Sequence, residues 1–282
     1  MEHAMSELPL ALFTVLASAG AGAFIALAIA SFSAQFDEGK QAQIDRATWI
    51  PVAVVVVGFI AASFHLTNPL NAVNVFSGLG RSPLTNEVCM GMVFAVVAIV
   101  YAILANAGKL NPGSRKGLLV VTAVLALCFG LLMGMAYLLP TMQSWNSWAT
   151  PVEMIGLTLV GGAATGALVL AFAEDEAGFP ARGLTAMAYL GAALAVIAAT
   201  AMAGATGGMS TMLYAGSALV GGAMPALVCG CVALVAGAVC TQLAAKRGIG
   251  MAAAAVVLVI VGALALRLAF YAMQLSVGLS VL

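Results

Sequence analysis

The sequence predicts an all-α integral membrane protein with eight transmembrane helices. Of its 282 residues, 63% are hydrophobic and only 7% are charged, a composition that indicates a membrane protein. Its apolar runs repeatedly reach the length of about 20 residues that spans a bilayer core. Charged residues, prolines and glycines separate these runs, and the resulting spans are expected near residues 9–33, 50–66, 86–107, 117–139, 151–173, 183–204, 224–244 and 249–277.

The eight spans are expected to form a single polytopic membrane domain over residues 1–282, which can be divided into two four-helix bundles. The N-terminal stretch MEHAMSELPL lacks the basic region of a signal peptide, so the first apolar run is expected to remain as a helix. The segment 203–225 is rich in glycine and serine, which leaves its structure open.

Local sequence patterns support individual helices. Pro51 follows Trp49 at the start of the second span, as a first-turn proline beside a tryptophan at headgroup level. The fifth span begins with a typical helix start: Thr150 as capping residue, Pro151 in the first turn and Glu153 at the capping-box position. This pattern gives Glu153 a structural explanation.

Glycines four residues apart predict where helices approach closely. Gly130 and Gly134 have this spacing in the fourth span, and Gly162 and Gly166 have it in the fifth. In lipid, such small residues let two helix backbones come together.

The basic residues predict the orientation. Eight of the ten lie in loops that follow odd-numbered spans, and cytoplasmic loops carry the excess of lysine and arginine. We therefore expect a multi-pass protein of the bacterial cytoplasmic membrane with both termini outside. The eight residues are Lys40, Arg46, Lys109, Arg115, Lys116, Arg182, Lys246 and Arg247.

Three ionisable residues are expected at one depth in the outer leaflet. With a rise of about 1.5 Å per residue, His65 lies roughly 21 Å from Pro51, Glu87 roughly 33 Å from Lys109, and Arg267 roughly 30 Å from Arg247. A charge left in hydrocarbon costs about 2.5 to 3.5 kcal/mol even on a lenient scale. Three such residues at one depth therefore favour a shared polar site.

Each of the three also has a structural alternative. His65 could neutralise the carbonyl end of a helix, Glu87 could be a first-turn acid, and Arg267 could extend to the headgroups. The loop between His65 and Glu87 is long and polar, and we expect it to fold as a cap over the site. Asn68 and Arg81 in this loop are candidate supporting residues.

The composition also argues against several classes of site and partner. Ten basic and ten acidic residues cancel without a basic patch, so no nucleic acid partner is expected. The five cysteines lack the spacing of an iron–sulfur site, and no metal site is expected. No haem is expected, because His3 precedes the first span and His65 stands alone within the others.

Four groups of motifs carry a resemblance to a known family. The segment from His65 reads HLTNPLNAVN and continues at Ser82 as SPLTNEVCMGMVF. The N-terminal region has ELPLALFT and AGAF, and the C-terminal region has RLAFY followed by VG. In this order and spacing, the sequence resembles the membrane-anchor subunit of anaerobic dimethyl sulfoxide reductases.

The resemblance implies an eight-helix anchor that binds and oxidises menaquinol. Its electrons would pass to an iron–sulfur subunit that feeds a molybdopterin catalytic subunit. The depth of the three ionisable residues, and not the resemblance, suggests that these subunits dock on the outer face. In that family the residues matching His65 and Glu87 belong to the quinol site. Leu266 replaces a glycine usual in the family and Gln274 replaces a histidine, so the C-terminal part of the site departs from the pattern.

We expect His65 to hold one quinol hydroxyl as donor or base and Glu87 to accept a proton, because imidazole titrates near physiological pH. Arg267, Asn68 and Arg81 are expected to help bind the quinol.

Three alternatives remain open at this point. A quinone-linked anchor of the polysulfide- or nitrite-reductase type shares the eight-helix plan. A small-solute transporter would explain the glycine-rich segments 67–83 and 206–223, which occupy corresponding positions in the two halves. A purely structural anchor would leave His65 unexplained.

Overall fold

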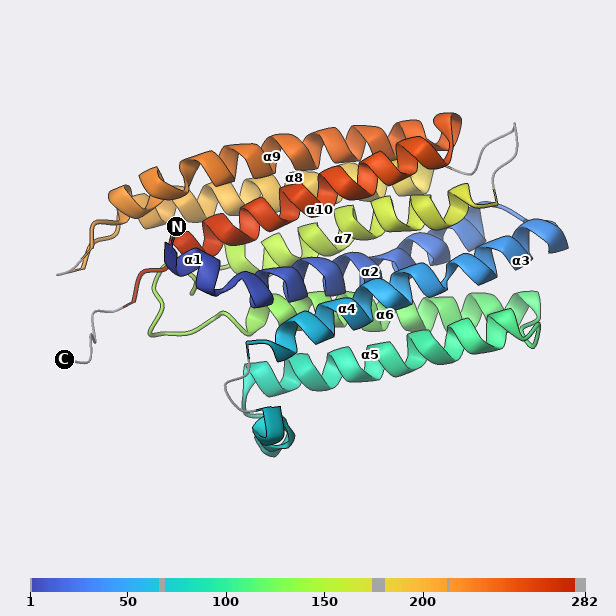
Figure 1. The fold of residues 1–282 in the computed structure, drawn as a ribbon, viewed down its shortest axis with the longest axis horizontal. Helices are drawn as coiled ribbons and strands as arrows, with labels where there is room; N and C mark the ends of the chain where they lie inside the picture. Colours follow the sequence, from blue (N-terminus) through green and yellow to red (C-terminus); the bar gives the residue numbers. More distant parts are fainter. Residues whose placement is uncertain (1, 66–68, 174–180, 212–213, 277–282) are drawn as a thin grey trace.

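The computed structural model describes residues 2–65, 69–173, 181–211 and 214–276 as a bundle of long helices that run side by side (Figure 1). Within these residues, eight helical segments are long and apolar enough to cross a membrane, which confirms the predicted fold class. They are α2 (Leu8–Ser33), α3 with α4 (Glu38–Ala47 and Trp49–Ser63), α5 (Pro83–Asn106), α6 (Pro112–Met135), α7 (Ala149–Ala171), α8 (Ala181–Gly207), α9 (Gly216–Arg247) and α10 (Ile249–Ala272). A short helix α1 (Glu2–Ser6) precedes α2, and a 3-10 helix η1 (Pro69–Gly78) lies between α4 and α5.

Two helices form the centre of the bundle. In α2 and in α7, 83% of the most apolar stretch is buried, whereas the other spans bury between 33% and 50% of theirs. The helices α2 and α7 pack directly on each other and join the two halves of the protein into one core. The outer helices turn apolar side chains such as Val96, Val232 and Val257 away from the protein, as helices facing lipid do.

The second span is longer than the sequence predicts. The side chain of Asp37 accepts a hydrogen bond from the backbone N–H of Lys40 at 2.8 Å and caps the start of α3. Because α4 follows α3 directly, one apolar stretch extends from Glu38 to Ser63. Lys40 and Arg46 therefore lie on a helix and not in an open loop.

The glycine-rich region 203–225 is largely helical where it is described. Helix α8 continues to Gly207, and α9 begins at Gly216, eight residues before the predicted start at 224. Pro225 thus lies inside α9, which membrane helices tolerate because nearby groups can satisfy the freed backbone.

The bundle has two chemically different ends. At one end, which we call the Glu87 end, α2, α5, α7 and α9 begin and α4, α6, α8 and α10 finish (Figure 1). The opposite end, where α3 begins, is called the Asp45 end. The eight basic residues that predict the orientation all come from helix ends or connections at the Asp45 end. Their common location agrees with the positive-inside argument, while the membrane face of each end remains a prediction.

Candidate functional site

Glu87 lies inside the protein, one turn from the start of α5. The Ser82 hydroxyl caps this helix, and Glu87 is its fifth residue with only 3% of its surface exposed. The preceding loop is fastened to the same turn, because the Thr85 hydroxyl donates to the carbonyl of Val75 at 2.7 Å and the Asn86 side chain accepts from the N–H of Gly80 at 2.8 Å. The buried position argues against a simple surface acid at the helix start.

Arg267 of α10 is buried completely, with 0% of its surface exposed. Its guanidinium carbon lies 4.0 Å from the ring centroid of Phe270, 4.8 Å from that of Tyr137 and 5.0 Å from that of Tyr271. Cation–π contacts of this kind stabilise a desolvated cation. The side chain therefore faces the interior of the bundle and does not extend to the headgroups.

Aromatic side chains around Arg267 hold the segment between α6 and α7 against α10. The hydroxyls of Tyr137 and Tyr271 lie 2.6 Å apart, and Arg267 Nη2 donates to the Tyr271 hydroxyl at 3.3 Å. Trp145 stacks on Phe270 with ring centroids 4.9 Å apart and donates its Nε1–H to the Phe270 carbonyl at 3.2 Å. We call these packed rings, Tyr137, Trp145, Phe270 and Tyr271, the aromatic wall beside the guanidinium.

Glu153 of α7 is the site residue that the sequence reasoning missed. The predicted capping box is wrong: Trp148 is the N-cap without a side-chain hydrogen bond, and the Thr150 hydroxyl donates to the Trp145 carbonyl at 2.7 Å. Glu153 instead points into the bundle with 1% of its surface exposed. The only available signal was its depth, since Glu153 and Glu87 are both the fifth residue of a helix that begins at the Glu87 end.

Several buried polar atoms in this region have no partner among the described residues. Both carboxylate oxygens of Glu153 and the Nε and Nη1 atoms of Arg267 make no hydrogen bond. Buried polar groups in proteins are nearly always satisfied, so an unsatisfied group indicates a bound water or ligand. The arrangement can therefore offer two donors and two acceptors to a polar molecule.

Arg267 acts electrostatically on both Glu87 and Glu153. Helices α5, α7 and α10 thus each contribute one buried ionisable residue near the Glu87 end. In a low-dielectric interior, such charges interact more strongly than in water. The structure buries Glu87, Arg267 and Glu153 near the same end of the bundle, and their common role in a site remains a prediction.

His65 lies at the same end but outside the helix. Helix α4 ends at Ser63, and the N–H of His65 donates to the Ala62 carbonyl at 3.1 Å in a tightened last turn. The His65 side chain is 41% exposed, and its Nδ1 lies 3.7 Å from a carboxylate oxygen of Glu7. Among the described contacts, no hydrogen bond or ion pair joins His65 to Glu87.

Arg81 and Asn68 are the two residues that the sequence predicts to support the site. Arg81 is exposed on the loop before α5, and only its backbone N–H makes a described contact, with the Gly78 carbonyl at 3.0 Å. Asn68 lies outside the described residues.

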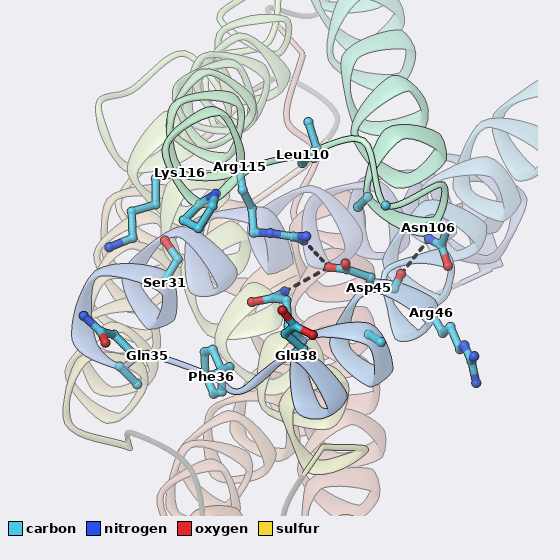
Figure 2. Close-up of a pocket in the computed structure, with 16 residues that line it drawn as sticks. Ser31, Gln35, Phe36, Glu38, Asp45, Arg46, Asn106, Leu110, Arg115 and Lys116 are labelled. Carbon is cyan, nitrogen blue, oxygen red and sulfur yellow. Dashed lines mark hydrogen bonds and ion pairs between the residues drawn. The ribbon is translucent and has the colours of Figure 1, made fainter.

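A pocket lies at the opposite, Asp45 end. It has a volume of about 780 Å³ and lies between α3, the end of α5 and the start of α6. Figure 2 shows that its central charge, Asp45, is already engaged: its carboxylate pairs with Arg115 and accepts from Gln41 at 2.9 Å, and its carbonyl accepts from Asn106 at 2.7 Å. None of the predicted site residues lines this pocket. The engaged Asp45–Arg115 pair indicates a structural role for these two residues at the membrane boundary.

Replacing Tyr137 by phenylalanine should weaken the aromatic wall. The change removes the hydroxyl pair with Tyr271, and a lost buried hydrogen bond costs about 1 to 3 kcal/mol when its partner is left unsatisfied. The detergent-extracted protein should therefore aggregate at a lower temperature in a thermal ramp. Tyr214→Phe is the matched control, because the Tyr214 side chain is 60% exposed. Equal midpoints for both variants would show that the hydroxyl pair contributes nothing.

Comparison with known proteins identifies the family. The family model for the DMSO reductase anchor subunit (DmsC) matches residues 1–273. The C subunit of the anaerobic dimethyl sulfoxide reductase of Escherichia coli (strain K12) is 28% identical over 281 residues, which cover 98% of this protein and 97% of that subunit. The corresponding C subunit of Haemophilus influenzae is 27% identical over 199 residues, or 71% of each protein. A further Escherichia coli relative, the YnfH subunit of an anaerobic dimethyl sulfoxide reductase, is 31% identical over 170 residues, or 60% of each protein.

The family match extends over all eight membrane-length helices. It favours a DMSO reductase anchor over the small-solute transporter that the glycine-rich segments also suggested. An eight-helix membrane bundle and a match of this length lead to one conclusion: the chain belongs to the family of DMSO reductase anchor subunits.

Proposed function

We propose that this membrane anchor binds menaquinol at the Glu87 end, oxidises it, and passes the electrons to an iron–sulfur subunit of a molybdopterin oxidoreductase. The observation that carries the proposal is the buried Arg267 guanidinium, whose Nε and Nη1 atoms have no hydrogen-bond partner among the described residues and whose charge acts on the buried Glu87. An ionisable residue buried inside a membrane bundle is a functional-site candidate.

The chemical groups at this end suit a quinol. A quinol is a flat apolar ring with two hydroxyls, so its site needs an aromatic surface and polar partners for both oxygens. Tyr137, Phe270 and Trp145 supply aromatic surface around Arg267. The unpaired atoms of Arg267 supply donors for a quinone oxygen.

Each predicted residue has a role in this proposal. His65 holds one hydroxyl of the quinol as donor or base, and Glu87 accepts a proton released by the oxidation. The contact between His65 and Glu7 gives the imidazole a route for proton exchange with water, because both side chains are partly exposed. Arg81 and Asn68 are proposed to help bind the quinol from the polar segment that precedes α5.

We propose that the electrons leave to a carrier outside this protein, because the spacing of its five cysteines does not match that of an iron–sulfur site. We propose that an iron–sulfur subunit docks at the Glu87 end, where a cluster can approach the quinol, and that a molybdopterin subunit follows it. The concentration of basic residues at the Asp45 end supports an outward-facing Glu87 end.

The proposal is tested by binding 2-heptyl-4-hydroxyquinoline N-oxide, a fluorescent quinol analogue, to membranes that contain the complex. Binding should be saturable and should be lost in His65→Ala, because the variant lacks the group proposed to hold one oxygen of the ring. Gln43→Ala, at the Asp45 end, is the control and should bind normally. Co-purification of an iron–sulfur protein with the anchor is the second expectation. Normal analogue binding in His65→Ala would remove this residue from the site.

A further inference from the structure

We infer that Glu153 is a second carboxylate of the quinol site and takes one of the two protons released when the quinol is oxidised. The inference rests on the proposed function and adds to it a residue that the capping pattern had assigned a structural role.

The first support is that Glu153 is buried without a partner. It is 1% exposed, and neither carboxylate oxygen has a hydrogen-bond partner among the described residues, Arg267 included. A carboxylate that served only as the counter-ion of Arg267 would be expected in direct contact with the guanidinium. Both oxygens of Glu153 are instead available to another polar group.

The second support is the common depth of the two glutamates. Each is the fifth residue of a helix that begins at the Glu87 end, and Arg267 is the sixth residue from the end of α10. Five residues of helix correspond to about 7 Å of depth. The two carboxylates thus lie on α5 and α7 at a similar distance from the membrane boundary, and both experience the charge of Arg267.

The third support is the proton balance of the reaction. Oxidation of a quinol breaks two O–H bonds and releases two protons and two electrons, and it leaves the quinone. The electrons go to the iron–sulfur centre of the partner subunit. One proton goes to Glu87 and the other to Glu153, while His65 remains the hydrogen-bond donor to the ring. Arg267 stabilises the ionised form of each carboxylate, the form that can accept a proton, because a nearby cation acts strongly in a low-dielectric region.

The test compares Glu153→Gln with Glu87→Gln in membranes that contain the whole complex. Three quantities are measured: binding of 2-heptyl-4-hydroxyquinoline N-oxide, turnover driven by a menaquinol analogue, and turnover driven by reduced viologen, which donates electrons without using the quinol site. We expect Glu153→Gln to lower quinol-driven turnover about 10²-fold, the scale of a lost acid–base group. Analogue binding and viologen-driven turnover should stay normal.

Glu38→Gln provides the matched control, because it makes the same chemical change on an exposed residue at the Asp45 end. It should leave all three quantities unchanged. If Glu153→Gln fails to accumulate, Glu153→Asp in the same assays is decisive, since it keeps the charge but retracts the carboxylate. Lower quinol-driven turnover with normal analogue binding supports the inference, and unchanged turnover overturns it.

The outcomes separate the inference from the proposed function. A defect in Glu87→Gln together with normal turnover in Glu153→Gln would overturn the role of Glu153 and keep the quinol site. Normal quinol-driven turnover in both variants would end both proposals.

Discussion

Glu87→Gln is expected to abolish quinol-driven electron transfer while the anchor still assembles with its partner subunits. Glutamine has nearly the same shape as glutamate but cannot take a proton at neutral pH, so the change removes only the proton acceptor. Loss of a general base lowers rates about 10²- to 10⁴-fold. Because Glu87 is 3% exposed at the start of α5, a neutral replacement should not disturb packing.

The measurement is turnover of the membrane-bound complex with a menaquinol analogue, compared with turnover driven by reduced viologen. Only the first should collapse. Asn86→Ala is a useful comparison on the same turn, since it removes the side chain that accepts from the N–H of Gly80 and so loosens the loop. Its quinol-driven turnover should fall less than that of Glu87→Gln. A fully active Glu87→Gln complex would refute the proton-acceptor role.

Gly162→Val should prevent the two halves of the bundle from packing. A Cβ atom at Gly162 of α7 would overlap the backbone of Gly22 on α2, and a Cβ at Gly22 would overlap the Thr158 carbonyl. Backbone atoms do not move aside as the end of a flexible side chain does. Overpacking costs about 1 to 3 kcal/mol and occasionally more, and this contact lies at the centre of the core, so we expect the upper end of that range.

The expected result is a strong loss of folded protein in the membrane and a lower thermal aggregation midpoint after detergent extraction. Gly204→Val on α8 is the matched control, because nothing lies within 4 Å of a Cβ built at Gly204. It should accumulate normally. If the two variants accumulate equally, close packing of α2 on α7 is not what holds the halves together.

Much of the fold follows from the sequence because burial in lipid constrains it strongly. A backbone in hydrocarbon must satisfy its own hydrogen bonds, so long apolar runs become helices. The structure accordingly places a membrane-length helix in each of the predicted regions. The helix ends were less predictable, since Asp37 adds α3 to the second span and Pro225 is accommodated inside α9.

The glycine pairs predict that helices pack closely, but they do not predict which helix each pair contacts. Gly130 lies against Thr158 and Gly134 against Pro151, so this pair joins α6 to α7, whereas Gly162 meets Gly22 of α2. Small residues four apart indicate a close approach. Which helix makes that approach depends on the whole arrangement, which no single span encodes.

The sequence by itself determined the helical membrane fold and the gathering of basic residues at one end, and it indicated ionisable residues at one depth. These properties follow from hydropathy and from the regular rise of a helix along one axis. Only the tertiary structure decided which side chains face one another around that axis. It placed Arg267 among aromatic rings, exposed part of His65 beside Glu7, and turned Glu153 into the interior. The physical reason is that a span's apolar character fixes its depth, while its rotation and neighbours are set by packing against the other helices.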